Sequence, residues 1–85
     1  MLTMTPLDLE NVRLEFREAF GHYVQETAVT EKLLTSLPFP PSGHDLQRLL
    51  VQQAKERDAF SRYQQARDRY VTRALNQMSA KAAAV

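Results

Sequence analysis

The sequence predicts an all-α fold, an antiparallel two-helix hairpin, and two observations lead to that prediction. Three of the four prolines in the 85 residues stand at 38, 40 and 41, shortly before Gly43. On each side of this Pro-rich segment, apolar residues recur at intervals of three and four, which is the spacing of one helix face. A short linker between two long helices makes them antiparallel neighbours. A chain of this length supports a single domain, 1–85.

The first helix is expected at about 6–36. Pro6 suits the first helical position, and the prolines of the turn stop the helix at its other end. Gly21 and the β-branched residues up to Thr30 lower the helix propensity, so a kink between Gly21 and Thr30 is the alternative to one straight helix. The predicted apolar face comprises Leu9, Val12, Phe16, Ala19, Phe20, Tyr23, Leu34 and Leu37.

The turn is expected at 37–42, the second helix at about 43–77, and a tail at 78–85 that either extends the helix or frays. Ser42 and Asp45 have the spacing of a capping box, with Asp in place of the usual Glu. Neither Pro nor Gly follows Gly43, which favours a long helix. The predicted apolar face comprises Leu46, Leu49, Leu50, Phe60, Tyr63, Tyr70, Val71, Ala74, Leu75 and Met78.

Folding about this turn sets residue i roughly opposite residue 82 − i. In that register the aromatic residues of the two helices lie at the same levels along the hairpin, and Arg67 lies near Glu15. The apolar pairs and the oppositely charged pairs therefore support the same register. The side chains expected in the core or in an interface are Phe16, Phe20, Tyr23, Leu34, Leu49, Phe60, Tyr63 and Tyr70.

The apolar arc of the second helix is wider than one neighbouring helix can cover. The usual solution is a second hairpin, so we expect a homodimer that forms a four-helix bundle. The corresponding function is non-enzymatic protein–protein interaction, as a self-associating, adaptor, export-chaperone-like or assembly subunit.

A basic stripe runs along the second helix and supports an alternative function. Arg48, Lys55, Arg62 and Arg69 recur every seven residues. Evenly spaced cations can neutralise phosphates, so a nucleic-acid-associated helical protein is the alternative. Solvated charges, or charges paired with acids of a partner, are typical of the same pattern. The six acids and three bases of 1–41 give −3, and the four acids and eight bases of 42–85 give +4, which favours packing the halves together.

Other chemistry finds little support in the sequence. The chain has no Cys, and Glu15, Glu18, His22 and Glu26 contain no Glu-x-x-His pair of the kind that bundle metal sites use. Ser42, His44 and Asp45 lie too close in sequence for a nucleophile, a base and its orienting group. There is no Gly-rich phosphate loop. We therefore expect no catalytic site, no metal, no cofactor and no small-molecule substrate.

The sequence also gives an expectation for the compartment. No apolar run approaches the roughly 20 residues of a membrane span, and the first residues lack the pattern of a secretory signal. We expect no membrane partner and a cytoplasmic protein, with signal-less secretion left open.

The outline resembles two classes of small helical protein. A short chain with a Pro-containing turn between two helices is similar to type III secretion needle subunits. Helices rich in Gln, Arg and Glu are similar to small flagellar-type export chaperones. The Trp-x-Gly turn of small secreted hairpins is missing, because the chain has no Trp. No motif accompanies these resemblances, so no family is assigned and no functional residue is transferred.

Overall fold

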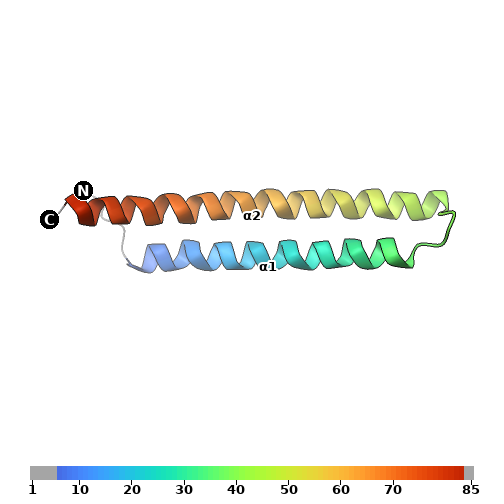
Figure 1. The fold of residues 1–85 in the computed structure, drawn as a ribbon, viewed down its shortest axis with the longest axis horizontal. Helices are drawn as coiled ribbons and strands as arrows, with labels where there is room; N and C mark the ends of the chain where they lie inside the picture. Colours follow the sequence, from blue (N-terminus) through green and yellow to red (C-terminus); the bar gives the residue numbers. More distant parts are fainter. Residues whose placement is uncertain (1–5, 84–85) are drawn as a thin grey trace.

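The computed structural model describes residues 6–83 and the side chains of residues 8–79. Helix α1 spans Pro6–Ser36 and helix α2 spans Gly43–Ala83, and the described residues contain no strand. The two helices run antiparallel and are joined at one end by the Pro-rich turn (Figure 1). The chain is therefore an all-α helical hairpin.

Helix α2 begins with a complete capping box. The Asp45 N–H donates to Ser42 Oγ at 3.1 Å, and Asp45 Oδ2 accepts from both the N–H and the hydroxyl of Ser42, at 3.0 and 2.8 Å. The first helical bond follows from Leu46 N–H to the Ser42 carbonyl at 3.0 Å. These bonds satisfy donors that a helix start otherwise leaves without partners.

Helix α1 is continuous through the stretch where a kink was considered. The hydroxyls of Thr27 and Thr30 donate to carbonyls one turn earlier, those of Tyr23 and Glu26, at 2.7 and 3.1 Å. Seam contacts to α2 lie on both sides of Gly21, and such packing overrides a weak local propensity.

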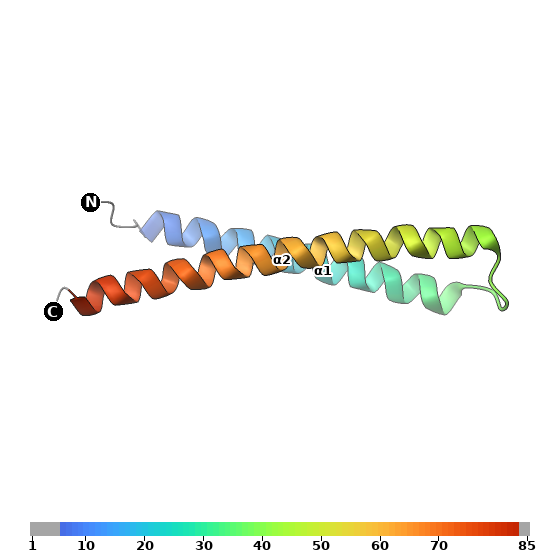
Figure 2. The ribbon, with the colours of Figure 1, turned by 90° about the horizontal axis from the view of Figure 1, so that it is seen from above.

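Helix α2 is longer than predicted. It extends to Ala83, past the expected end at 77, while residues 84–85 of the predicted tail lie outside the described residues. The hairpin measures 65 × 16 × 14 Å, and in a view turned by 90° the two helices cross at a shallow angle (Figure 2). Its radius of gyration of 19.1 Å exceeds the value of about 12 Å for a compact domain of this length.

The contact between the helices, called the seam below, follows a heptad pattern. Nearly all of the buried and half-buried residues of α1 and α2 recur at alternating intervals of three and four, which is the pattern of a left-handed coiled coil. On α1 the seam consists of Leu9, Val12, Phe16, Ala19, Tyr23, Glu26, Thr30 and Leu33, and Leu37 of the turn continues it. On α2 it consists of Asp45, Leu49, Gln52, Glu56, Ala59, Tyr63, Ala66, Tyr70, Ala74 and Gln77, with Ala74 one residue past the heptad position between Tyr70 and Gln77.

The seam is narrower and more polar than the predicted apolar faces. Leu33 occupies the seam position that was assigned to Leu34, which is 48% exposed. On α2 the most buried positions are Gln52, Ala59 and Ala66, none of which belonged to the predicted face. The apolar pattern pointed about one residue away from the true contact line, because small and polar residues give no apolar signal.

The pairing of the helices lies close to the expected register. Glu26 bonds to Gln52, Tyr23 stacks on Tyr63, and the paired residue numbers in these contacts add up to 78 and 86, on either side of 82. The charge pairing differs in detail, since Arg69 rather than Arg67 reaches Glu15, at 3.6 Å.

Candidate interaction surfaces

Six aromatic rings form a connected cluster that extends from the middle of the hairpin toward the end remote from the turn. Tyr63 is its centre, with ring centroids 5.8 Å from Phe16, 5.4 Å from Phe20, 5.8 Å from Tyr23 and 6.2 Å from Phe60. The guanidinium of Arg67 lies 5.6 Å above the Tyr63 ring, a cation–π contact. Tyr70 joins the cluster through Phe16, at 5.8 Å. The cluster therefore fixes the contact between the two helices.

The seam divides the remaining surface of the hairpin into two long faces. One of them, called the apolar face below, lies on the side of the seam where Phe20 and Phe60 flank the aromatic cluster. Eight large apolar side chains fall on this side by their helical spacing, and each is between 39% and 66% exposed. They are Phe20, Val24, Leu34, Leu46, Leu50, Phe60, Val71 and Met78.

The opposite side, called the basic face below, carries the predicted basic stripe and two grooves between the helices. The groove nearer the turn has a volume of about 750 Å³ and is lined by Val29, Lys32, Leu33, Ser36, His44, Gln47, Arg48, Val51, Gln52 and Lys55. The second groove has about 410 Å³ and is lined by Glu15, Glu18, Ala19, His22, Arg62, Gln65, Ala66 and Arg69. The residues that line the two grooves lie in the seam, on the basic face, or on the side of a helix that points away from the other helix.

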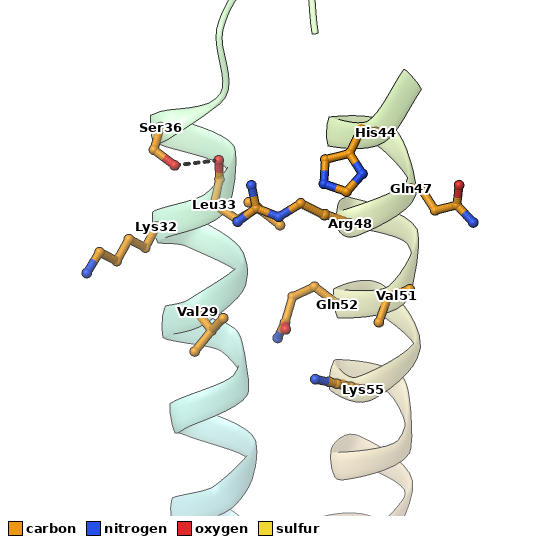
Figure 3. Close-up of a pocket in the computed structure, with 10 residues that line it drawn as sticks. All are labelled: Val29, Lys32, Leu33, Ser36, His44, Gln47, Arg48, Val51, Gln52 and Lys55. Atoms are coloured by element: carbon orange, nitrogen blue, oxygen red, sulfur yellow. Dashed lines mark hydrogen bonds between the residues drawn. The ribbon is translucent and has the colours of Figure 1, made fainter. Parts of the chain in front are cut away.

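The side chains of the groove nearer the turn are arranged asymmetrically. Arg48 extends from α2 across the groove toward α1, and Gln52 and Lys55 also point into it (Figure 3). Lys32 points outward from α1 at the outer rim. In the seam beneath, the Gln52 side-chain amide donates to the Glu26 carbonyl and to Glu26 Oε2, at 3.1 and 2.8 Å. The floor of the groove thus contains hydrogen bonds between Gln52 of α2 and Glu26 of α1.

The structure places the predicted interface residues in two groups. Phe16, Tyr23, Leu49, Tyr63 and Tyr70 lie half-buried in the seam. Phe20, Leu34 and Phe60 lie on the apolar face. Sequence reasoning did not find Lys32, Val29 and Val51 as groove residues. Val51 lies three residues after Arg48 and four before Lys55, and spacing within one helix does not indicate which residues of the other helix lie opposite.

The four cations of the basic stripe differ in their partners. Arg62 pairs with Asp58 at 3.3 Å and Arg69 with Glu15 at 3.6 Å. Arg48 and Lys55 form no ion pair within the described part of the chain. The stripe is therefore ion-paired at the end remote from the turn, whereas near the turn Lys55 has no ion pair and Arg48 acts on Asp45 from beyond ion-pair distance.

The residues considered above for catalysis or metal binding include Ser42 and Asp45, which bond to each other at the start of α2. Hydrogen bonds from the Ser42 backbone and hydroxyl lower the pKa of Asp45, and the nearby charges of Arg48 and His44 act in the same direction. Asp45 and Ser42 therefore serve the helix start. Within the residues that the structure describes, no group of three His, Asp or Glu side chains could hold a metal ion.

The turn presents one large aromatic side chain. Phe39 lies between Pro38 and Pro40 and is 97% exposed. The side chain contributes to the apolar surface of the hairpin without contributing to the seam.

Neither of the two described helices has a stretch that is long and apolar enough to cross a membrane. No protein-family model, no curated protein and no solved structure matches the chain.

Proposed function

We propose that the protein acts through protein–protein interaction and that its apolar face pairs with the same face of a second copy, giving a four-helix bundle. The observation that supports this most directly is the gathering of eight exposed, large apolar side chains on one side of the seam. Large apolar side chains gathered on one exposed side are typical of interaction surfaces.

The burial within the hairpin supports the same proposal. Only three apolar side chains are buried among the described residues, Val12, Ala59 and Ala66, and no large side chain is fully buried. Two of the three are alanines, which contribute little apolar area. A chain of this size usually needs an additional source of stability, and association is one such source.

The exposed area is large enough for a dimer. The hairpin exposes 6762 Å², whereas a compact monomer of this mass exposes about 5,200 Å². The excess is greater than the roughly 800 Å² that each partner buries in an interface of standard size. An isologous contact between two apolar faces would bring this surface into line with that of a globular protein.

Sedimentation velocity across a wide range of protein concentrations tests the proposal. We expect the wild type to sediment with twice the chain mass. The double variant Val24→Glu/Leu50→Glu places two carboxylates on the apolar face at positions that are 47% and 66% exposed. It should sediment as a monomer, because burying these charges without partners is costly.

Leu14→Glu/Leu75→Glu is the matched control. Its positions are 44% and 57% exposed and lie on the backs of the two helices, away from the seam. This variant should keep the mass of the wild type. A wild type that stays monomeric at high concentration, or two double variants that dissociate equally, would refute the proposed pairing.

A further inference from the structure

The groove nearer the turn has a charge that distinguishes it from the second groove. Its lining includes Lys32, Arg48 and Lys55 and no carboxylate. None of these three cations forms an ion pair with another residue of the described chain. The second groove contains Glu15 and Glu18 beside its two arginines. The groove nearer the turn is therefore the part of the basic face where positive charge remains available.

Apolar side chains accompany these cations. Val29 and Val51 are 49% and 53% exposed on the two sides of the groove, and Leu33 is half-buried between them. The groove has a volume of about 750 Å³, within the range of about 300–1,000 Å³ of small-molecule pockets, so side chains of a larger ligand can enter it. The combination of apolar walls and surrounding cations is complementary to a ligand with an apolar side and an acidic side.

The spacing of the cations suits a helical ligand. Arg48 and Lys55 are two helical turns apart on α2, which is about 10.5 Å along the axis. Acidic residues separated by seven positions on a partner helix have the same separation. A helix that lies in the groove can place apolar side chains against Val29 and Val51 while its carboxylates meet Arg48 and Lys55, as in helix-in-groove recognition.

We propose that this groove binds an acidic amphipathic helix of a partner protein. Charge complementarity and the apolar walls identify the chemistry of the occupant. A nucleic-acid backbone fits these observations less well, because Glu15, Glu18 and Asp58 oppose phosphates along the rest of the stripe. Phosphates would also leave Val29, Leu33 and Val51 without apolar contacts.

The test uses the full chain and a fluorescently labelled synthetic peptide. The probe is a helical peptide with leucines at intervals of three and four on one side and glutamates seven residues apart at its edge. Fluorescence anisotropy should show saturable binding. A peptide with Gln in place of those glutamates and a peptide with Ser in place of the leucines should both bind more weakly.

Two charge-reversal variants locate the binding site. Arg48→Glu/Lys55→Glu should raise the Kd by about tenfold or more, since each change replaces attraction by repulsion. Arg62→Glu/Arg69→Glu changes two residues of the same heptad column at the same spacing and should leave the Kd within about twofold. Circular dichroism and sedimentation of both variants check that the hairpin and its association state are retained.

Three results would overturn the proposal. The first is the absence of binding of the acidic peptide to the wild type. The second is an equal loss of affinity in the two variants, which would indicate general attraction to a basic surface. The third is tighter binding of single-stranded DNA than of the peptide, lost in Arg48→Glu/Lys55→Glu, which would assign the groove to nucleic acid.

Discussion

The two halves of the seam share one heptad pattern and differ in nearly everything else. From the middle of the hairpin toward the end remote from the turn, the rings of Phe16, Tyr23, Tyr63 and Tyr70 contact one another across the helices. In the half nearer the turn, Glu26, Thr30, Gln52 and Glu56 occupy seam positions beside Leu33, Leu37 and Leu49. The comparison shows that one backbone geometry can be stabilised by apolar area in one region and specified by polar bonds in another.

The two kinds of contact contribute differently to folding. Aromatic pairs add about 0.5–1.5 kcal/mol beyond the area they bury. A typical hydrogen bond contributes about 0.5–1.5 kcal/mol net, but leaving a buried partner without its bond costs about 1–3 kcal/mol. Gln52 is 7% exposed, so its bonds to Glu26 disfavour every register that breaks them. We therefore attribute stability to the aromatic half and register to the half nearer the turn.

The largest expected effect comes from removing the centre of the aromatic cluster. Tyr63→Ala removes four ring contacts and the contact to Arg67. Because Tyr63 is half-buried, we expect the free energy of unfolding to fall by about 2–3 kcal/mol, below the 3–5 kcal/mol of a fully buried aromatic. Urea denaturation at one fixed protein concentration measures the change.

Glu56→Ala is the matched control for this comparison. Glu56 precedes Tyr63 by seven residues and is also half-buried in the seam. Its replacement should change the free energy of unfolding by less than about 0.5 kcal/mol, because Ala is the better helix former and little apolar area is lost. Similar losses in both variants would show that the two halves of the seam contribute equally.

A smaller loss in the free energy of unfolding is expected in the half nearer the turn. There the loss depends on whether one or both residues of the Glu26–Gln52 pair are replaced. Gln52→Leu removes the donor to the Glu26 carbonyl and carboxylate, and should cost about 1–2 kcal/mol. Glu26→Leu/Gln52→Leu replaces both polar partners by apolar groups and should recover most of that loss. A double-mutant cycle in urea should give a coupling energy of about 1 kcal/mol.

The same cycle separates stability from register. Crosslinking by a short bis-maleimide between Cys substitutions at Glu15 and Arg69, whose charged side-chain ends lie 3.6 Å apart in the native hairpin, reports the native register. The double leucine variant should form this crosslink less completely than the wild type. Additive free energies, together with unchanged crosslinking, would show that the Glu26–Gln52 bonds contribute nothing to the choice of register.

Much of the fold could be predicted because it depends on strong local signals. Prolines and a capping box mark the turn, and apolar residues at three and four positions mark the helices. The exact seam was less accessible, because Gln52, Ala59 and Ala66 pack closely without an apolar signal. The groove was missed for a related reason: Lys32 and Val29 on α1 meet Arg48 and Val51 on α2 only after the helices pair.

The smallest expected effect concerns the cap at the turn, and it depends on pH. Because hydrogen bonds from Ser42 lower the pKa of Asp45 below its ordinary value of 3.8, the folded state binds the proton more weakly than the unfolded state. The stabilisation by Asp45 is thus present above pH 3.8 and is lost as the pH falls through the lowered pKa of the folded state. Asp45→Asn should be less stable than the wild type at neutral pH, and the difference should shrink in acid. Thermal unfolding across this pH range measures the stability difference between Asp45→Asn and the wild type.

Asp68→Asn is the control, since the exposed Asp68 makes no hydrogen bond to the backbone of the described residues. A stability difference for Asp45→Asn that stays constant from neutral pH into acid would mean that the carboxylate charge is not what stabilises the start of α2.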